Sequence, residues 1–114
     1  MAGKSDEAEN QIVVSPEVFS PNGDGFNDQL SIQYQFTKPG FVANVRIFDA
    51  SGKLVKYLVK NQLQSQSGSW IWDGKSDSGK TLEIGVFIIL VEIYNEAGET
   101  KALKRTCTLT DRLN

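Results

Sequence analysis

Histidine is absent from this chain, and cysteine occurs only once, as Cys107. Without histidine, the chain lacks the commonest general base and the commonest zinc ligand. A single cysteine excludes an intrachain disulfide, and a lone thiol is more often a small core hydrophobe than a nucleophile. Carboxylates are present, but none is matched with a plausible partner base. We therefore predict that the domain is not an enzyme and requires no cofactor for catalysis.

Long apolar runs and strong net charge are also missing. The longest apolar run, residues 86–91, is far too short to cross a bilayer. The formal net charge is −2, and the lysines and arginines are scattered along the chain. Such a chain has no field that would attract nucleic acid. We expect a domain that is not transmembrane, does not bind nucleic acid and is a monomer when isolated.

The composition suits one globular domain, because 114 residues with 39% hydrophobic content can bury a core without disulfides or a structural metal. The opening MAGKSDEAEN is polar and acidic, shows no signal peptide and cannot order itself. We predict a disordered linker or cloning scar at 1–10, a folded domain at 11–110 and a C-terminal tail at 111–114. The natural protein is expected to be larger.

Strand patterns dominate what is present. Residues 30–36 alternate apolar and polar side chains, as a strand with one face on a core must. The turn formula Asx-x-x-Gly occurs at 49–52 and again at 95–98, and each copy joins two strand-like segments into a hairpin. Residues 86–91 are apolar on both faces, which predicts a central strand covered on both sides. No segment shows the period of an amphipathic helix.

An initial strand at residues 12–19 is interrupted by Pro16, which suits the edge of a sheet. Together the segments make about seven short strands separated by turn residues. We predict an all-β fold, an immunoglobulin-like antiparallel β-sandwich. The missing cysteine pair excludes a true antibody-type domain, and a small closed barrel is the other architecture open to such a sequence.

The aromatic residues allow two interpretations. Trp70, Trp72, Tyr57 and Phe48 could form a platform on which sugars stack. Immunoglobulin-like folds, however, commonly bury a tryptophan, so we predict that at least one of the two indoles belongs to the core. Residues 72–74 are interpreted as a core ring, an aspartate that opens an Asx turn and a glycine that supplies a positive φ.

The stretch FSPNGDGFND, residues 19–28, has oxygen-bearing side chains and glycines in unusual density. Asn22, Asp24 and Asp28 are candidate ligands for calcium, which prefers six to eight oxygen ligands. The bidentate glutamate of an EF-hand is missing, so carbonyls and water would have to complete the shell. The other interpretations are a tight turn, in which aspartates accept backbone N–H bonds, and a motif that another protein recognises.

The same ten residues resemble the opening F-(S/T)-P-N-G-D-G-x-N-D of gliding-motility-associated C-terminal domains, the type IX secretion sorting domains of Bacteroidetes. Further positions are similar to that family, and they are residues 45–55, residues 72–74, Gly79 and residues 85–87. They also resemble the Ig-like domain of the flagellar hook-capping protein. The likeness covers roughly residues 16–109. One departure is that the family's Gly-x-Tyr-x-Tyr reads Gly-Val-Phe-Ile-Ile at residues 85–89.

The resemblance implies a C-terminal sorting and anchoring module of a large exported protein, which directs secretion across the outer membrane. The expected location is extracellular or at the cell surface, and the expected partners are the secretion apparatus or cell-surface components. For such a module the candidate recognition loop is the FSPNGDGFND segment, because its glycines and Asx residues fix a particular backbone shape at a sheet end. Its candidate residues are Pro21, Asn22, Gly23, Asp24, Gly25, Asn27 and Asp28. The alternative is an Ig-like spacer or a binding module for calcium or carbohydrate, which would occur mid-chain rather than at an extreme C-terminus.

Overall fold

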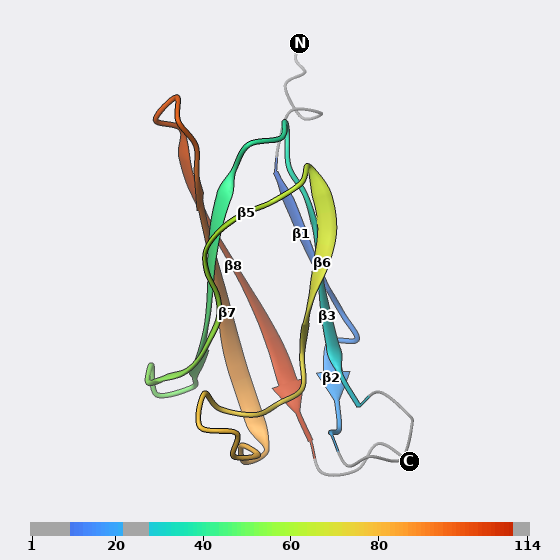
Figure 1. The fold of residues 1–114 in the computed structure, drawn as a ribbon. Helices are drawn as coiled ribbons and strands as arrows, with labels where there is room; N and C mark the ends of the chain where they lie inside the picture. The colour runs from blue at the N-terminus through green and yellow to red at the C-terminus, as the bar shows by residue number, and fades with distance from the viewer. Residues whose placement is uncertain (1–9, 22–27, 111–114) are drawn as a thin grey trace.

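The computed structural model describes residues 10–21 and 28–110, which form eight strands in two packed sheets and no helix (Figure 1). The strands are β1 Gln11–Ser15, β2 Val18–Phe19, β3 Leu30–Gln35, β4 Val42–Asp49, β5 Leu54–Leu63, β6 Ser67–Trp72, β7 Gly85–Tyr94 and β8 Thr100–Leu109. The predicted β-sandwich is therefore confirmed, with eight strands where about seven were expected.

One sheet has three strands in the order β1-β3-β6, and the other has five in the order β2-β8-β7-β4-β5. All pairs are antiparallel except β2 and β8, which run parallel through Val18 and Phe19. At Pro16 the chain leaves the three-stranded sheet after β1 and joins the opposite sheet as β2. The predicted edge position of this interrupted strand is confirmed for both of its pieces.

The core lies between the inner faces of the two sheets, where period-two alternation places every second residue. Strands β3, β4 and β7 contribute most of it, and both tryptophans of β6 face inward. Its fully buried members include Phe19, Leu30, Ile32, Phe36, Val45, Ile47, Trp72, Ile89 and Val91. Aromatic rings contact one another within it; Trp72 lies 5.5 Å from Phe87 in an edge-on arrangement.

Strand β7 is central, but only one of its faces is covered, so the expectation of cover on both sides is wrong. Phe87 points into the core, whereas Val86 is 47% exposed and Ile88 and Leu90 are half-buried. These outward residues are flanked by side chains of neighbouring strands: Ile88 lies opposite Phe48, for example. Side chains of adjacent strands in the same sheet thus shield the outward apolar side chains of β7, although no second sheet packs on that face.

Both predicted Asx-x-x-Gly turns are confirmed. In the β4–β5 turn, the Gly52 N–H donates to the Asp49 carbonyl at 2.9 Å, and Gly52 has a φ of 91°. In the β7–β8 turn, the Gly98 N–H donates to the Asn95 carbonyl at 3.1 Å. The Asx side chain at the start of each turn accepts further backbone N–H bonds, which closes both hairpins without bulky residues.

Candidate recognition surface

The FSPNGDGFND motif begins in the core. The Phe19 side chain is fully buried and its ring lies 5.5 Å from that of Trp72. The Phe19 carbonyl accepts a hydrogen bond from the Thr110 N–H at 2.9 Å, and Ser20 is also buried. The first residues of the motif are therefore structural anchors, which fix where the following loop leaves the sandwich.

Pro21 then packs against Gly74, the last residue of the Trp-Asp-Gly motif. A Cβ atom at Gly74 would lie 2.9 Å from the Pro21 Cγ, so only glycine fits beside that ring. Gly74 has a φ of 82°, and the Lys75 N–H donates to the Asp73 Oδ1 at 3.1 Å. The interpretation of Trp72, Asp73 and Gly74 as core ring, Asx turn and positive-φ glycine is confirmed. Two motifs about fifty residues apart thus form one junction.

Most of the predicted calcium and recognition residues lie outside the described residues: Asn22, Gly23, Asp24, Gly25 and Asn27. Pro21 and Asp28, which border this segment, are described. Within residues 10–21 and 28–110, no group of three or more histidine, cysteine, aspartate or glutamate side chains could hold a metal ion. The calcium site at Asn22, Asp24 and Asp28 therefore stays a prediction.

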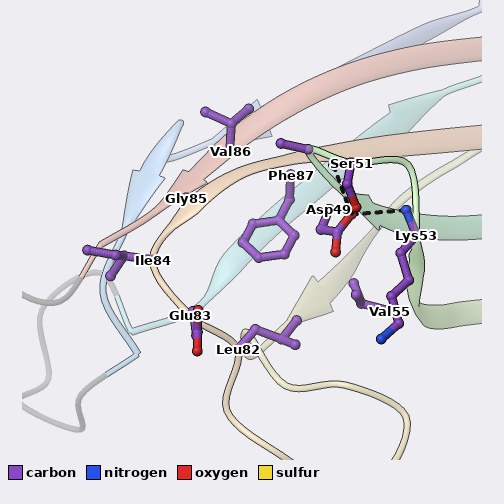
Figure 2. A pocket seen from close by; sticks show the side chains of 11 residues that line it. Asp49, Ser51, Lys53, Val55, Leu82, Glu83, Ile84, Gly85, Val86 and Phe87 are labelled. Atoms are coloured by element: carbon purple, nitrogen blue, oxygen red, sulfur yellow. Dashed lines mark hydrogen bonds between the residues drawn. The ribbon is translucent and has the colours of Figure 1, made fainter.

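A groove opens beside the start of β7, between the β4–β5 turn and residues 82–86 (Figure 2). The Phe87 ring forms its floor, and Ile84, which is 64% exposed, stands at its rim. Because Gly85 pairs with Leu109 and Leu109 pairs with Phe19, the groove is at the same end of the five-stranded sheet as the motif junction. This end is the candidate recognition surface.

Asp49 is the carboxylate that Figure 2 shows at the edge of this groove. Its Oδ1 accepts the Ser51 hydroxyl at 2.6 Å, the Ser51 N–H at 3.0 Å and the Lys53 N–H at 2.9 Å. These bonds, the Ser51 hydroxyl first, lower the pKa of Asp49. The Asp49 carboxylate therefore serves to close the turn. The groove presents apolar side chains around this ionised group, which does not suit acid–base chemistry.

The four aromatic residues considered as a sugar platform do not come together. Trp70 and Trp72 lie on the inner face of the three-stranded sheet. Tyr57 and Phe48 lie on the outer face of the opposite sheet, in register with Arg46 and Ile88. The core interpretation therefore holds for both indoles, and no stacking surface is formed by this set.

A polar network that the sequence did not suggest covers part of the outer face of the five-stranded sheet. Arg46 forms an ion pair with Glu92 and donates to the Tyr57 hydroxyl at 3.2 Å. The Tyr57 hydroxyl donates to the Asn44 Oδ1 at 2.5 Å, and Asn44 Nδ2 donates to the Asn61 Oδ1 at 3.0 Å. The partners come from three strands, so no local spacing signals them. The network braces β5 against β4 where their register shifts.

Residues 74–81, in the connection from β6 to β7, satisfy the G-x-x-x-x-G-K-[ST] spacing of a phosphate-binding loop. Such a loop requires a helix to follow, so that free N–H groups face the phosphate. Here Ser76 N–H donates to the Lys80 carbonyl, Gly79 N–H donates to the Ser76 carbonyl, and Lys75 bridges to Thr81. The segment is a small hairpin whose N–H groups donate to carbonyls of the same segment, and it is followed by strand β7 instead of a helix.

Cys107 is buried in the core, facing inward from β8. Burial raises the pKa of its thiol to about 12, so the thiol stays protonated near neutral pH. Its predicted role as a small core hydrophobe is confirmed. No helix long and apolar enough to cross a membrane occurs in the part of the chain that the structure describes.

Residues 13–106 match the family described as CHU_C, type IX secretion signal domain. No curated protein matches the chain. Among solved structures, FlgD from P. aeruginosa is 22% identical, with a TM-score of 0.57, and the match covers 71% of this chain and 62% of that one. The chain thus spans less than two thirds of that FlgD chain.

Two further structures share the fold. FlgD from Xanthomonas campestris is 24% identical, with a TM-score of 0.53 and coverage of 91% of this chain and 72% of that one. CopC from Methylosinus trichosporium OB3b is 17% identical, with a TM-score of 0.58 and coverage of 93% and 98%. At these identities the likeness shows a common sandwich and nothing about what the chain binds.

Proposed function

Because the chain belongs to the CHU_C type IX secretion signal domain family, which matches residues 13–106, we propose that the secretion machinery reads the folded sandwich through the loop at residues 21–28. The chain is a C-terminal sorting module, and the protein that carries it is exported to the cell surface or outer membrane. A secretion signal domain is a non-catalytic module that interacts with the secretion machinery. The family match is the single observation that carries this function.

The junction below the loop supports the choice of recognition element. Phe19 and Pro21 are held by Trp72 and Gly74, so the loop starts from a rigid base at a sheet end. Loops that a rigid scaffold presents are where proteins commonly place recognition residues. The proposed elements are Pro21, Asn22, Gly23, Asp24, Gly25, Asn27 and Asp28. We further propose that the isolated domain is a monomer and has no catalytic activity of its own.

The test is export of a passive reporter fused to this chain, in a host that has the type IX machinery and in the same host without it. The expected result is reporter outside the outer membrane only when the machinery is present. If the intact chain fails to export the reporter in the competent host, the sorting function is rejected. A binding or spacer module then becomes the better description.

The loop is tested separately by replacing Gly23 and Gly25 with valine. Valine disfavours any positive φ at these positions, so the loop should lose its backbone shape while the sandwich remains folded. The matched control replaces Gly98 with valine, because Gly98 has a φ of 87° in the β7–β8 turn, at the end of β7 opposite the groove. Export lost by the loop variant, with unchanged circular dichroism and with export retained in the control, supports recognition through the loop. Export that survives in both variants shows that the loop is scaffolding only.

A further inference from the structure

Four strands lie at sheet margins, and the structure protects three of them. A margin exposes a row of backbone N–H and C=O groups that can pair with another strand. Strand β2 has only two residues, which leaves little to pair. At β1, which has five residues and is followed by Pro16, the Ile12 carbonyl accepts the Arg105 Nε–H at 3.0 Å, so a cationic side chain from the other sheet occupies part of that margin.

The β5 margin is protected by several devices. The Asp77 N–H donates to the Val55 carbonyl at 3.1 Å, and the Asp77 carboxylate accepts the Tyr57 N–H. The pairing with β4 contains register shifts, and Asn61 has a φ of 47°, so the strand bends away from a flat edge. Lys56 also stands on this strand, and charge discourages pairing at a margin.

Strand β6 is the exception. Residues 64–72 read QSQSGSWIW and contain no charged residue and no proline. The pairing of β6 with β3 runs through six residue pairs without a register shift. No further strand lies beside β6 within residues 10–21 and 28–110. This strand is therefore uncharged and regularly paired with β3, and no described strand pairs with its other side.

The alternation of backbone hydrogen bonds along β6 shows which N–H and C=O groups point away from β3. The Phe36 N–H donates to the Gln66 carbonyl at 2.7 Å, so even-numbered residues of β6 bond to β3. The odd-numbered residues then direct their backbone groups outward. In agreement, the Ser67 carbonyl accepts the Ser65 hydroxyl at 2.7 Å rather than a β3 amide. The Ser67 N–H and the N–H and C=O groups of Ser69 and Ile71 are the other outward groups of this strand.

The outer face of the three-stranded sheet has the same neutral character. In register, its rows are Gln11–Gln35–Ser67, Val13–Gln33–Ser69 and Ser15–Ser31–Ile71. No residue of this grid is charged. A neutral strand added beside β6 would meet no charge on either the margin or the adjoining face, whereas a charged strand would find no partner there.

We propose that β6 is a docking edge, to which an extended, uncharged strand of the secretion machinery adds as the fourth strand of the small sheet. Backbone bonds to Ser69 and Ile71 would hold it, which is the strand-addition mode of peptide recognition. The proposal rests on the proposed function, because the family supplies the partner. A second copy of the chain is the other possible occupant, and its detection is one outcome of the test below.

The test is the same reporter export assay with the full chain and three variants. Ser69→Pro removes one outward N–H and leaves the bonds to β3 intact. Ser69→Ala keeps that N–H, and Gln33→Lys puts a charge on the same outer face directly opposite Ser69 but on the inner strand of the sheet. Each variant is first required to keep the circular dichroism and melting temperature of the original chain. If Ser69→Pro fails that requirement, Ile71→Pro replaces it, and Ser69→Lys replaces both if neither folds.

Strand addition predicts that the Ser69→Pro variant exports at least about tenfold less reporter, because one bond is lost and one partner carbonyl is left unpaired. The two controls should export normally. Equal export by the Ser69→Pro variant overturns the proposal and leaves the sorting function standing. If the Gln33→Lys variant loses as much export as the Ser69→Pro variant, the partner docks on the outer face of the three-stranded sheet, and the proposal of docking at the β6 edge is rejected. Elution of the original chain as a dimer, with the Ser69→Pro variant monomeric, assigns the edge to a second copy. Failure of the unmodified chain to export rejects the sorting function itself.

Discussion

At the scale of single residues, the junction between Pro21 and Gly74 explains why two separate motifs occur in one small domain. The positive φ of Gly74 turns the chain away from β6, and the space beside its Cα is filled by the Pro21 ring. The Leu109 Cδ1 would lie 3.2 Å from a Cβ at the same position. Glycine is therefore required there for two independent reasons, backbone conformation and crowding.

Gly74→Ala and Gly79→Ala separate these two reasons. Their φ angles are nearly equal, 82° and 84°, but a Cβ at Gly79 would meet nothing within 4 Å. Gly79→Ala should cost about 1–2 kcal/mol, the strain of a left-handed residue. Gly74→Ala should cost about 1–3 kcal/mol more, because Pro21 must move. Urea unfolding of both variants measures the difference, and equal costs would show that Pro21 does not constrain Gly74.

Calcium binding is the residue-scale prediction that concerns the loop itself. If Asn22, Asp24 and Asp28 bind calcium, millimolar calcium should raise the melting temperature, because a ligand that binds only the folded state stabilises it. Asp24→Asn should abolish the rise. Thermal melts in calcium and in chelator measure it, with magnesium as the control for ionic strength. Identical melts in calcium and chelator would leave the tight turn as the role of these side chains.

Several residue roles could be predicted from the sequence because they depend on local patterns. Alternation over residues 30–36 placed Ile32 on the core face, and the turn formula placed Asp49 and Gly52 correctly. Contacts between distant segments could not be predicted in this way. Nothing in the spacing of Pro21 and Gly74 shows that they touch, because that depends on how the two sheets stack.

At the scale of elements, the β4–β5 hairpin shows how a side chain can determine a turn. The Asp49 carboxylate accepts three hydrogen bonds from Ser51 and Lys53, and these bonds lower its pKa. A carboxyl whose folded pKa is depressed contributes stability that is present above its unfolded pKa. That contribution is lost as the pH falls through the folded pKa. The hairpin should therefore loosen in acid.

Ser51→Ala tests this assignment, because the Ser51 hydroxyl is the largest cause of the lowered pKa. The variant should raise the pKa of Asp49 part of the way toward its ordinary value, because two of the three bonds remain, and the loss of stability in acid should become smaller. An NMR titration of the Asp49 carboxyl carbon measures the shift. Ser78→Ala, in the β6–β7 connection, is the control and should leave the pKa of Asp49 unchanged. An unaltered Asp49 titration in the Ser51→Ala variant would contradict the assignment.

Element positions were harder to predict than element existence. Strand β7 is apolar at consecutive positions, and such a run does not distinguish a strand covered on both faces from one shielded by its neighbours. Pro16 marked a break, but not that the chain changes sheets there and pairs β2 parallel to β8. Both outcomes are set by tertiary packing, which the local pattern does not contain.

At the scale of the whole molecule, the two sheets share one core and the chain passes between them repeatedly. Strand β1 is in one sheet and β2 in the other, and the same is true of β3 and β4, and of β5 and β6. Phe19, from the five-stranded sheet, contacts Trp72 in the small one. A three-stranded sheet with one apolar face has no core of its own once its partner is removed. Neither sheet should therefore be stable alone.

This dependence predicts a single cooperative unfolding transition. Both tryptophans, Trp70 and Trp72, are in β6, so their fluorescence reports the small sheet, whereas far-UV circular dichroism is dominated by the larger sheet. In urea, the two signals should give the same midpoint and the same slope, as two-state behaviour requires. Ile71→Ala, at a half-exposed position between the two indoles, should leave the two signals coincident and shift their midpoint little. A fluorescence midpoint clearly below the dichroism midpoint would show that the small sheet opens first. In that case the docking edge at β6 would belong to the less stable part of the molecule.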